Sequence, residues 1–463
     1  MLVCKFGGTS LGSADRFAAT ADVIATRLGQ PTVVVVSAMS KTTSALIEGA
    51  RAAADGRVAV YRTTREELES RHVSTIKQLL PLGPDRQALT QAIRDRLQNY
   101  GRLCASIATL GEYTMRGNDA VASVGEELSS RILAAVLRTR GIPAEAISAT
   151  EIVETDDQYG NATPDMTATE RKARSRLLPL LANGTVPVVT GYIGATPQGV
   201  TTTLGRGGSD YSAAILGVAL DAETVEIWTD VNGILTADPK LVPEATILRE
   251  LSYEEAAELA YFGAYVLHPK TIAPLAQRGI RLAILNSFCP EDPGTAVVAA
   301  PSKDRAIAPA ILSTEGLSLI RLSGNGRGWT LQMASRALHR LDEAGVDVLM
   351  FSQPFTERSL NLVVRASDEE HGLRLLTREF ERDARAGLMA DIATRQQVAS
   401  VSVVGMPRSR AAEVTSSAFA ALGALRQRVI AVAQATTGGS VSFILPEEDV
   451  EHVVPYMHSQ LGL

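Results

Sequence analysis

Three observations predict an α/β fold class in which a three-layer αβα domain precedes two ferredoxin-like βαββαβ modules. Short β-branched runs at 2–6 and 32–37 flank a segment with apolar residues at helical spacing, the opening of an α/β layer fold. Strand patterns return at 185–192 and 223–229, each before a loop rich in glycine or aspartate. From about residue 317 the order changes to strand, helix, strand, strand, helix, strand, which is typical of a split βαβ unit.

The bulk composition sets the class of protein. A chain of 463 residues is longer than one hydrophobic core usually supports, so more than one domain is expected. The net charge of −6 lacks the basic footprint of a nucleic-acid binder, so we expect no nucleic-acid partner. The three cysteines lie far apart without metal-ligand spacing, which predicts no metal site and a reducing, cytoplasmic location. With no apolar run near the ~20 residues of a membrane span, no membrane contact is expected.

Within the large domain, three features predict local structure and the domain end. The stretch 44–137 is rich in helix-forming residues and is expected to be a helical excursion. A helix is predicted over 252–262, because Ser252 and Glu255 form the capping-box pattern. The run CPEDPG contains several turn residues and marks the end of this domain. We therefore expect the large domain to span residues 1–300.

The C-terminal region contains one complete βαββαβ unit and a second copy that is one strand short. The complete unit has strands at 317–322, 346–353, 359–365 and 389–395 and helices at 331–344 and 368–384. The second copy has strands at 398–404, 429–434 and 440–445 and helices at 411–422 and 448–461. The leftover segment 306–313 supplies the missing strand. The first module (314–396) is therefore predicted to be inserted within the second (304–313 plus 397–463).

Two glycine-rich loops stand where a strand gives way to a helix. Lys5 precedes Gly7 and Gly8, so backbone N–H groups and a positive charge lie where an anion can bind. Because the lysine precedes the glycines this is not a P-loop, and a plain turn is the alternative. In the second loop, Arg206 is able to bind a carboxylate or phosphate through two of its nitrogens. Asp210 is able to hold a lysine or a magnesium-bound group, unless it pairs with Arg206 on the surface.

Four segments carry a family resemblance: KFGGTS at 5–10, GRGGSDYSA at 205–213, WTDVNGILTADPK at 228–240 and FGAYVLHPKT at 262–271. In this order and approximate spacing they resemble the aspartate kinases of the amino-acid kinase superfamily, and the region after residue 300 resembles the paired ACT modules of that family. The resemblance covers essentially the whole chain. It implies an amino-acid-kinase-like catalytic domain followed by two ACT modules, in a monofunctional enzyme without a fused homoserine dehydrogenase.

The resemblance implies a phosphotransferase activity. ATP, with Mg²⁺, would phosphorylate the side-chain carboxylate of L-aspartate to give 4-phospho-L-aspartate, the first step of aspartate-family biosynthesis towards lysine, threonine and methionine. Such a carboxylate is already ionised at pH 7, so no general base is needed and catalysis rests on alignment and charge neutralisation. The alternatives are a kinase for a related acidic amino acid and an amino-acid-sensing pseudokinase.

Roles for individual residues follow from the resemblance only. Lys5 and Asp210 would be catalytic, with Lys5 stabilising charge on the transferring phosphoryl group. Glu126 would pair with the substrate ammonium and Arg206 with its α-carboxylate, so that the substrate residues are Thr43, Glu126, Arg206 and Ser209. The nucleotide would be bound by Gly7, Gly8, Ser37, Thr229, Asp230, Ile234, Leu235, Lys240 and Tyr265. No protein ligand to a metal is expected.

Three nucleotide positions depart from the usual family pattern. Leu235 stands where a tyrosine is usual, Lys240 where an arginine is common, and Tyr265 where a lysine is usual. These changes predict an altered nucleotide affinity or preference, and Tyr265 is a candidate to replace the missing ring.

For the ACT modules, the resemblance implies an amino-acid effector, lysine or threonine, and a homodimer or higher homo-oligomer. The glycine-rich turn at 324–329 is typical of effector sites, and Gln353 and Gln434 resemble glutamines of threonine-sensing members. The run PFTE at 354–357 instead replaces the usual small polar residues. A purely dimerising role of the modules is therefore an equal alternative.

Overall fold

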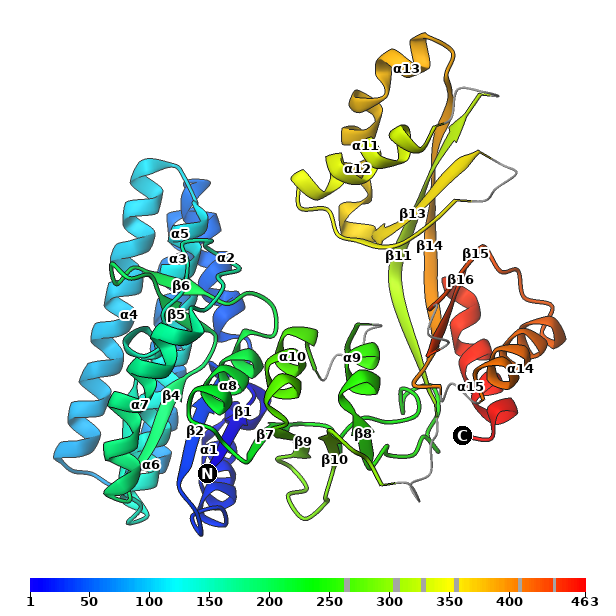
Figure 1. Cartoon of the computed structure of the whole chain (residues 1–463). Helices are drawn as coiled ribbons and strands as arrows, with labels where there is room; N and C mark the ends of the chain where they lie inside the picture. The colour runs from blue at the N-terminus through cyan, green and yellow to red at the C-terminus, as the bar shows by residue number, and fades with distance from the viewer. Residues whose placement is uncertain (262–266, 303–308, 326–329, 354–357, 407–409, 436–438) are drawn as a thin grey trace. The chain divides into compact units, whose positions relative to one another are not determined.

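The computed structural model describes residues 1–261, 267–302, 309–325, 330–353, 358–406, 410–435 and 439–463. These residues fall into two compact units, and both are drawn in Figure 1. The first unit holds Met1–Ile234, Arg249–Ala257 and the described part of 265–303. The second unit holds Leu235–Leu248 and the described parts of 258–264 and 304–463.

Within the described residues, an eight-stranded sheet forms the middle layer of the first unit, in the order β3-β4-β2-β1-β7-β9-β10-β8. Its neighbouring strands are parallel except for β9 and β10, which run antiparallel. The strands are β1 (Leu2–Phe6), β2 (Thr32–Val36), β3 (Ala144–Ile147), β4 (Val186–Thr190), β7 (Thr224–Thr229), β8 (Glu250–Ser252), β9 (Arg281–Asn286) and β10 (Thr295–Val298). Strands β1, β2 and β4 are buried throughout, as short apolar runs are when both faces of a sheet are covered.

Helices cover both faces of this sheet, which confirms the predicted three-layer arrangement. Helices α1 (Ala14–Ala25) and α6 (Val124–Thr139) share one hydrophobic core with β1 and β2. On the other face, α8 (Gly208–Ala219) packs against β1, β2 and β7, between α7 (Met166–Ala182) and α10 (Pro269–Arg278).

The predicted helical excursion is confirmed. Its helices gather beside α6 in Figure 1 and are α2 (Thr42–Ala54), α3 (Val58–Leu79), α4 (Pro84–Leu110) and α5 (Met115–Ala122). A hairpin of β5 (Ile193–Ala195) and β6 (Thr201–Thr203) lies against α5. This hairpin leads into the glycine-rich loop before α8.

The capping box predicted for the helix after 252 is present. Helix α9 spans Tyr253–Tyr261, and the predicted last residue, 262, lies outside the described residues. The Ser252 N–H donates to Glu255 Oε2 at 2.7 Å, and the Glu255 N–H donates to Ser252 Oγ at 3.1 Å. These two bonds satisfy backbone donors that the first turn of a helix leaves free.

The described strands of the second unit form one antiparallel sheet, ordered β12-β13-β11-β14-β16-β15. Its strands are β11 (Ala310–Gly324), β12 (Val348–Ser352), β13 (Ser359–Arg365), β14 (Met389–Val404), β15 (Ala431–Gln434) and β16 (Ser440–Pro446). The accompanying helices are α11 (Leu331–Glu343), α12 (Ala366–Glu379), α13 (Glu381–Arg385), α14 (Ala411–Ala424) and α15 (Val450–Leu461). Figure 1 shows β11 and β14 as long strands that serve both halves of this sheet.

Some predicted element boundaries are wrong in this unit. Four separate strands are expected from the sequence, at 306–313, 317–322, 389–395 and 398–404. Instead β11 and β14 each run unbroken through both halves, with shifts of register on either side of Leu317. Gly316 and Gln397, both with positive φ, provide the irregularity that lets the ladder continue past the shift. The helix expected over 368–384 is two helices, because the chain turns at Phe380 between α12 and α13.

Candidate active site

The loops after β1, β2 and β4, together with the start of α8, line a cavity of about 520 Å³ in the first unit. Parallel strands end at one edge of their sheet, where ligands bind in open α/β folds. The cavity is lined by Lys5, Gly8, Ser37, Ala38, Met39, Ser40, Lys41, Thr43, Ser44, Glu126, Gly160, Tyr192, Gly205, Arg206, Gly207, Gly208, Ser209 and Asp210. The structure therefore brings together many of the residues proposed from the sequence, namely Lys5, Gly8, Ser37, Thr43, Glu126, Arg206, Ser209 and Asp210.

Lys5 is the next-to-last residue of β1, and it lines the cavity. Side chains alternate along a strand, so Cys4 and Phe6 enter the core under α1 while Lys5 faces α8. Lys5 Nζ lies 2.6 Å from Asp210 Oδ1, and Lys5 is only 8% exposed. Asp210 stands in the first turn of α8, where the helix dipole also favours a carboxylate. Asp210 is thus paired with Lys5 and not with Arg206.

Glu126 stands in the first turn of α6 and is 3% exposed. Its Oε1 accepts the Ala38 N–H at 3.3 Å, whereas Oε2 is buried without a hydrogen-bond partner among the described residues. Burial raises the pKa of Glu126 to about 8, against the opposing effect of backbone N–H groups. A buried carboxylate oxygen with no partner is a binding position for a cationic group.

Close backbone packing explains two of the glycines. A Cβ on Gly8 would lie 2.9 Å from the Ala38 carbonyl oxygen, so the loops after β1 and β2 approach each other more closely than a side chain allows. Gly207 has a φ of +70°, and a Cβ there would lie 2.6 Å from His268 Cβ. Both loops therefore expose backbone to the cavity, as an anion site requires.

Arg206 is exposed at the cavity, and in the described part of the chain no ion pair engages its guanidinium. Lys41 and Tyr192, which the sequence reasoning did not single out, also line the cavity. Both have left-handed backbones, with φ of 66° and 70°. Burial raises the pKa of Tyr192, whose ring lies against Gly208 at the start of α8. The sequence offered no signal for these two residues, because their place at the cavity depends on the conformation of the loops.

Several proposed nucleotide residues do not line this cavity. Gly7 donates its N–H to the Trp228 carbonyl at 3.1 Å, which joins the loop after β1 to the end of β7. Thr229 and Asp230 follow at the same edge of the sheet. The Ile234 N–H donates to Thr295 Oγ1 at 2.8 Å.

The remaining proposed nucleotide residues lie elsewhere. Leu235 and Lys240 belong to the second unit. There Thr236 accepts the Ile311 N–H at 2.7 Å through its carbonyl oxygen, and its hydroxyl lies 2.9 Å from His458 Nε2 of α15. Tyr265 lies outside the described residues.

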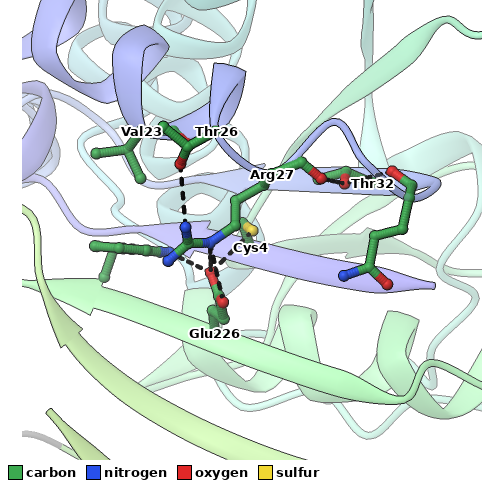
Figure 2. Close-up of polar contacts among 8 residues, drawn as sticks. Cys4, Val23, Thr26, Arg27, Thr32 and Glu226 are labelled. Atoms are coloured by element: carbon green, nitrogen blue, oxygen red, sulfur yellow. Dashed lines mark hydrogen bonds and ion pairs between the residues drawn. The ribbon is translucent and has the colours of Figure 1, made fainter. Parts of the chain in front are cut away.

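A polar cluster on the opposite face of the sheet holds β1, β7 and α1 together, as Figure 2 shows. The Glu226 carboxylate accepts hydrogen bonds from Arg27 Nε at 3.2 Å, from Trp228 Nε1 at 2.9 Å and from Cys4 Sγ at 3.4 Å. Burial, and then the Glu226 charge, raise the pKa of the Cys4 thiol well above its usual range. The cluster is therefore unreactive support for the strand that carries Lys5.

The described residues offer neither a metal site nor a membrane-spanning helix. No group of three or more histidine, cysteine, aspartate or glutamate side chains there is arranged to hold a metal ion. Within the same residues, none of the helices has the length and apolar character needed to cross a membrane.

Comparison with known proteins identifies the family. A model of the amino acid kinase family matches residues 1–286. Aspartokinase 1, chloroplastic, of Arabidopsis thaliana is 32% identical over 98% of this chain and 79% of its own length. The chain therefore belongs to the amino acid kinase family. Within that family it groups with the aspartokinases.

A solved structure matches the whole chain. E. coli aspartokinase III in complex with aspartate and ADP is 28% identical, covers 100% of both chains and has a TM-score of 0.84. The same protein in complex with lysine and aspartate has a TM-score of 0.78 at 27% identity. Another relative, bifunctional aspartokinase/homoserine dehydrogenase 1, chloroplastic, of Zea mays, is 30% identical over 100% of this chain and 50% of its own length. The chain spans about half the length of several curated relatives that it matches.

Proposed function

We propose that the protein transfers the γ-phosphoryl group of ATP to the side-chain carboxylate of L-aspartate. The observation that carries this proposal is that one cavity contains charged groups suited to an amino acid and a cation suited to a phosphoryl group. Among the described residues, one oxygen of the buried Glu126 carboxylate has no hydrogen-bond partner and the Arg206 guanidinium has no ion pair, and these two groups suit the two charges of an α-amino acid. Lys5, held by Asp210, adds the positive charge that a phosphoryl group requires.

In the proposed reaction a carboxylate oxygen of aspartate attacks the γ-phosphorus. The bond from that phosphorus to the bridging oxygen breaks, and ADP leaves with the electron pair. The nucleophile is ionised at neutral pH, so alignment and charge neutralisation account for the catalysis. Lys5 stabilises the oxygens of the transferring group, and Asp210 orients Lys5. Thr43 and Ser209 complete the substrate site.

The nucleotide side is proposed from the neighbourhood of the cavity. Gly7, Gly8 and Ser37 approach the phosphates, and Thr229, Asp230 and Ile234 follow at the same edge of the sheet. Mg²⁺ bound to the nucleotide would supply neutralisation of phosphate charge, since this ion typically binds through phosphates and few protein ligands. The nucleotide roles of Leu235, Lys240 and Tyr265 stay predictions.

We further propose that the C-terminal region regulates this activity through two ACT modules, with lysine or threonine as effector and in a homodimer or larger homo-oligomer. A module at 314–396 is inserted in one formed by 304–313 and 397–463. Support comes from Ala310–Ser313 of β11, which pair with Val401–Val404 of β14 and so lie beside a strand segment of the second module. The lysine-bound form of E. coli aspartokinase III favours lysine. A cytoplasmic location stays a prediction, because the relatives include chloroplastic proteins.

A hydroxamate assay with aspartate, ATP and Mg²⁺ tests the proposed function. The protein is expected to form acyl phosphate from aspartate and little from glutamate. Lys5→Ala is expected to lower kcat by about 10²–10³-fold, because it removes a charge aimed at the transition state. Absence of product from aspartate with either ATP or GTP would leave a sensing protein without kinase activity as the better description.

A further inference from the structure

We infer that Asp119 is a positioning residue that sets the spacing between the two walls of the cavity, and so between the groups that bind the ammonium and the α-carboxylate of the substrate. The inference rests on the proposed function. It concerns a residue that is not among those lining the cavity.

Asp119 is fully buried in α5, and its carboxylate binds two other segments at once. Oδ2 accepts the Gly160 N–H at 2.8 Å and the Thr203 N–H at 2.9 Å. Oδ1 accepts the Thr203 hydroxyl at 2.8 Å and Asn118 Nδ2 at 3.3 Å. One side chain therefore ties a helix, a loop and a strand together.

Each segment that Asp119 holds leads directly to the cavity. Gly160 itself lines it, and Thr203 ends β6 just before Gly205 and Arg206. The two segments also contact each other, because a Cβ on Gly205 would lie 2.6 Å from Asn161 Oδ1. Together they form the wall that carries the guanidinium for the α-carboxylate.

The other wall is connected to Asp119 through its own helix. Helix α5 ends at Ala122 and α6 begins at Val124, with Ser123 as the cap of both, and Glu126 stands in the first turn of α6. A single carbon separates the ammonium and the carboxylate of an α-amino acid, so their two binding groups tolerate little change in spacing. Small displacements of binding groups from productive geometry cost catalysis heavily.

The experiment compares steady-state kinetics of the full chain and its variants. Asp119→Ala removes the hydrogen bonds that Asp119 accepts from Gly160 and Thr203, and is expected to raise KM for aspartate about ten- to a hundredfold. KM for ATP is expected to stay within about threefold, because Lys5 and Gly8 lie on other segments. Asp119→Asn is expected to restore KM for aspartate to within about threefold, since its amide oxygen still accepts both backbone N–H groups.

Asp156→Ala is the matched control. Asp156 lies in the same loop as Gly160 and also accepts two backbone N–H groups, from Gln158 at 3.2 Å and from Thr163 at 3.0 Å. Its contacts stay within the loop, so both KM values are expected to remain within about threefold of wild type. A purely local effect on the loop would instead make the two alanine variants behave alike.

Three outcomes would overturn the inference: an unchanged KM for aspartate in Asp119→Ala, a parallel rise of both KM values, or no rescue by Asp119→Asn. Should Asp119→Ala not fold, Asp119→Ser, whose hydroxyl serves one donor, is expected to show the same split at smaller amplitude. If the wild type makes no acyl phosphate, the proposed function fails. Calorimetric titration with aspartate then tests Asp119 alone, and equal affinity of wild type and variant overturns the inference.

Discussion

In the proposed substrate site, Glu126 is expected to make the binding of aspartate sensitive to pH. Burial raises its pKa to about 8, so the carboxyl is largely protonated at neutral pH in the unliganded protein. An ammonium group binds the ionised form. We therefore expect aspartate affinity to rise by about tenfold per pH unit below pH 8 and to level off above it. Titration calorimetry with aspartate between about pH 6 and pH 9 measures this.

Glu126→Gln provides the control, with weak affinity for aspartate that does not vary over this range.

The same pKa shift affects folding. A raised folded pKa stabilises the native state fully below the unfolded value of 4.5, and this contribution is lost as pH rises through about 8. Urea unfolding should show wild type losing roughly a few kcal/mol relative to Glu126→Gln between these limits. If the free energy of unfolding changed with pH in the same way in both proteins, the raised pKa of Glu126 would be contradicted.

Position 8 requires glycine because there is no room for a side chain, and not because of its backbone conformation. Its φ of −62° is open to any residue, but a Cβ would lie 2.9 Å from the Ala38 carbonyl oxygen. Gly8→Ala is expected to push the loops after β1 and β2 apart and to lower kcat/KM for ATP by at least about tenfold. Gly29→Ala, where a Cβ meets nothing within 4 Å, should leave kinetics unchanged. Equal activity of both variants would remove the steric argument.

At the scale of single residues, the sequence is informative about charge and silent about backbone shape. Lys5 and Arg206 could be proposed because each is a charged group in a glycine-rich loop, whereas Glu126 was proposed from the family resemblance alone. Lys41 and Tyr192 could not, because a left-handed backbone at a residue with a side chain leaves no compositional mark. Their conformations are imposed by the loops around the cavity.

Among the elements, α3 stabilises the site without facing it. Arg71 donates to the Ser40 carbonyl at 2.7 Å and to the Gly12 carbonyl at 3.0 Å, so one guanidinium joins the loops after β1 and β2. Arg71→Met is expected to lower kcat/KM about tenfold and stability by about 1–3 kcal/mol, because both carbonyls lose their donor. Enzyme kinetics with urea unfolding measures both, and Arg62→Met, exposed on the same helix, should change neither.

Elements with a strong local signal were predicted well. Strand β1, the loop after it and the capping box of α9 each depend on a few neighbouring residues, so periodicity and end signals suffice. The union of predicted strands into β11 and β14 could not be foreseen. It depends on pairing between residues 65 to 94 positions apart in the sequence. This pairing lets the ladder continue across a bulge, which from the local sequence looks like the end of a strand.

On the scale of the whole molecule, the stretch WTDVNGILTADPK, which carries part of the family resemblance, divides between the two units at Ile234. The part from Leu235 to Leu248 packs with α15 and β11, where Ala237 and Val242 join an apolar core. No neighbouring residue indicates this division, because the elements that pack against the segment lie in the last third of the chain. A motif can thus be recognised as one piece and still fold as two.

The second unit is expected to unfold as one body, because its halves share β11 and β14. Val403→Ala, a fully buried change in β14, should cost about 1–3 kcal/mol. Hydrogen exchange should accelerate in β13 as well as in β16, although β13 lies across the sheet. Val432→Ala on the edge strand β15, where the side chain is 37% exposed, should change stability by less than about 0.5 kcal/mol. Acceleration confined to β16 would mean that the halves open independently.

The shared strands also limit how such a chain can be recombined. A chimera with a crossover between the two halves would sever β11 and β14 in mid-strand and leave two open sheet edges, which invite aggregation. Halves of this sheet should therefore be exchanged between relatives only as a pair. Insertions and deletions are better tolerated in the loops that join its helices and strands than along these two strands.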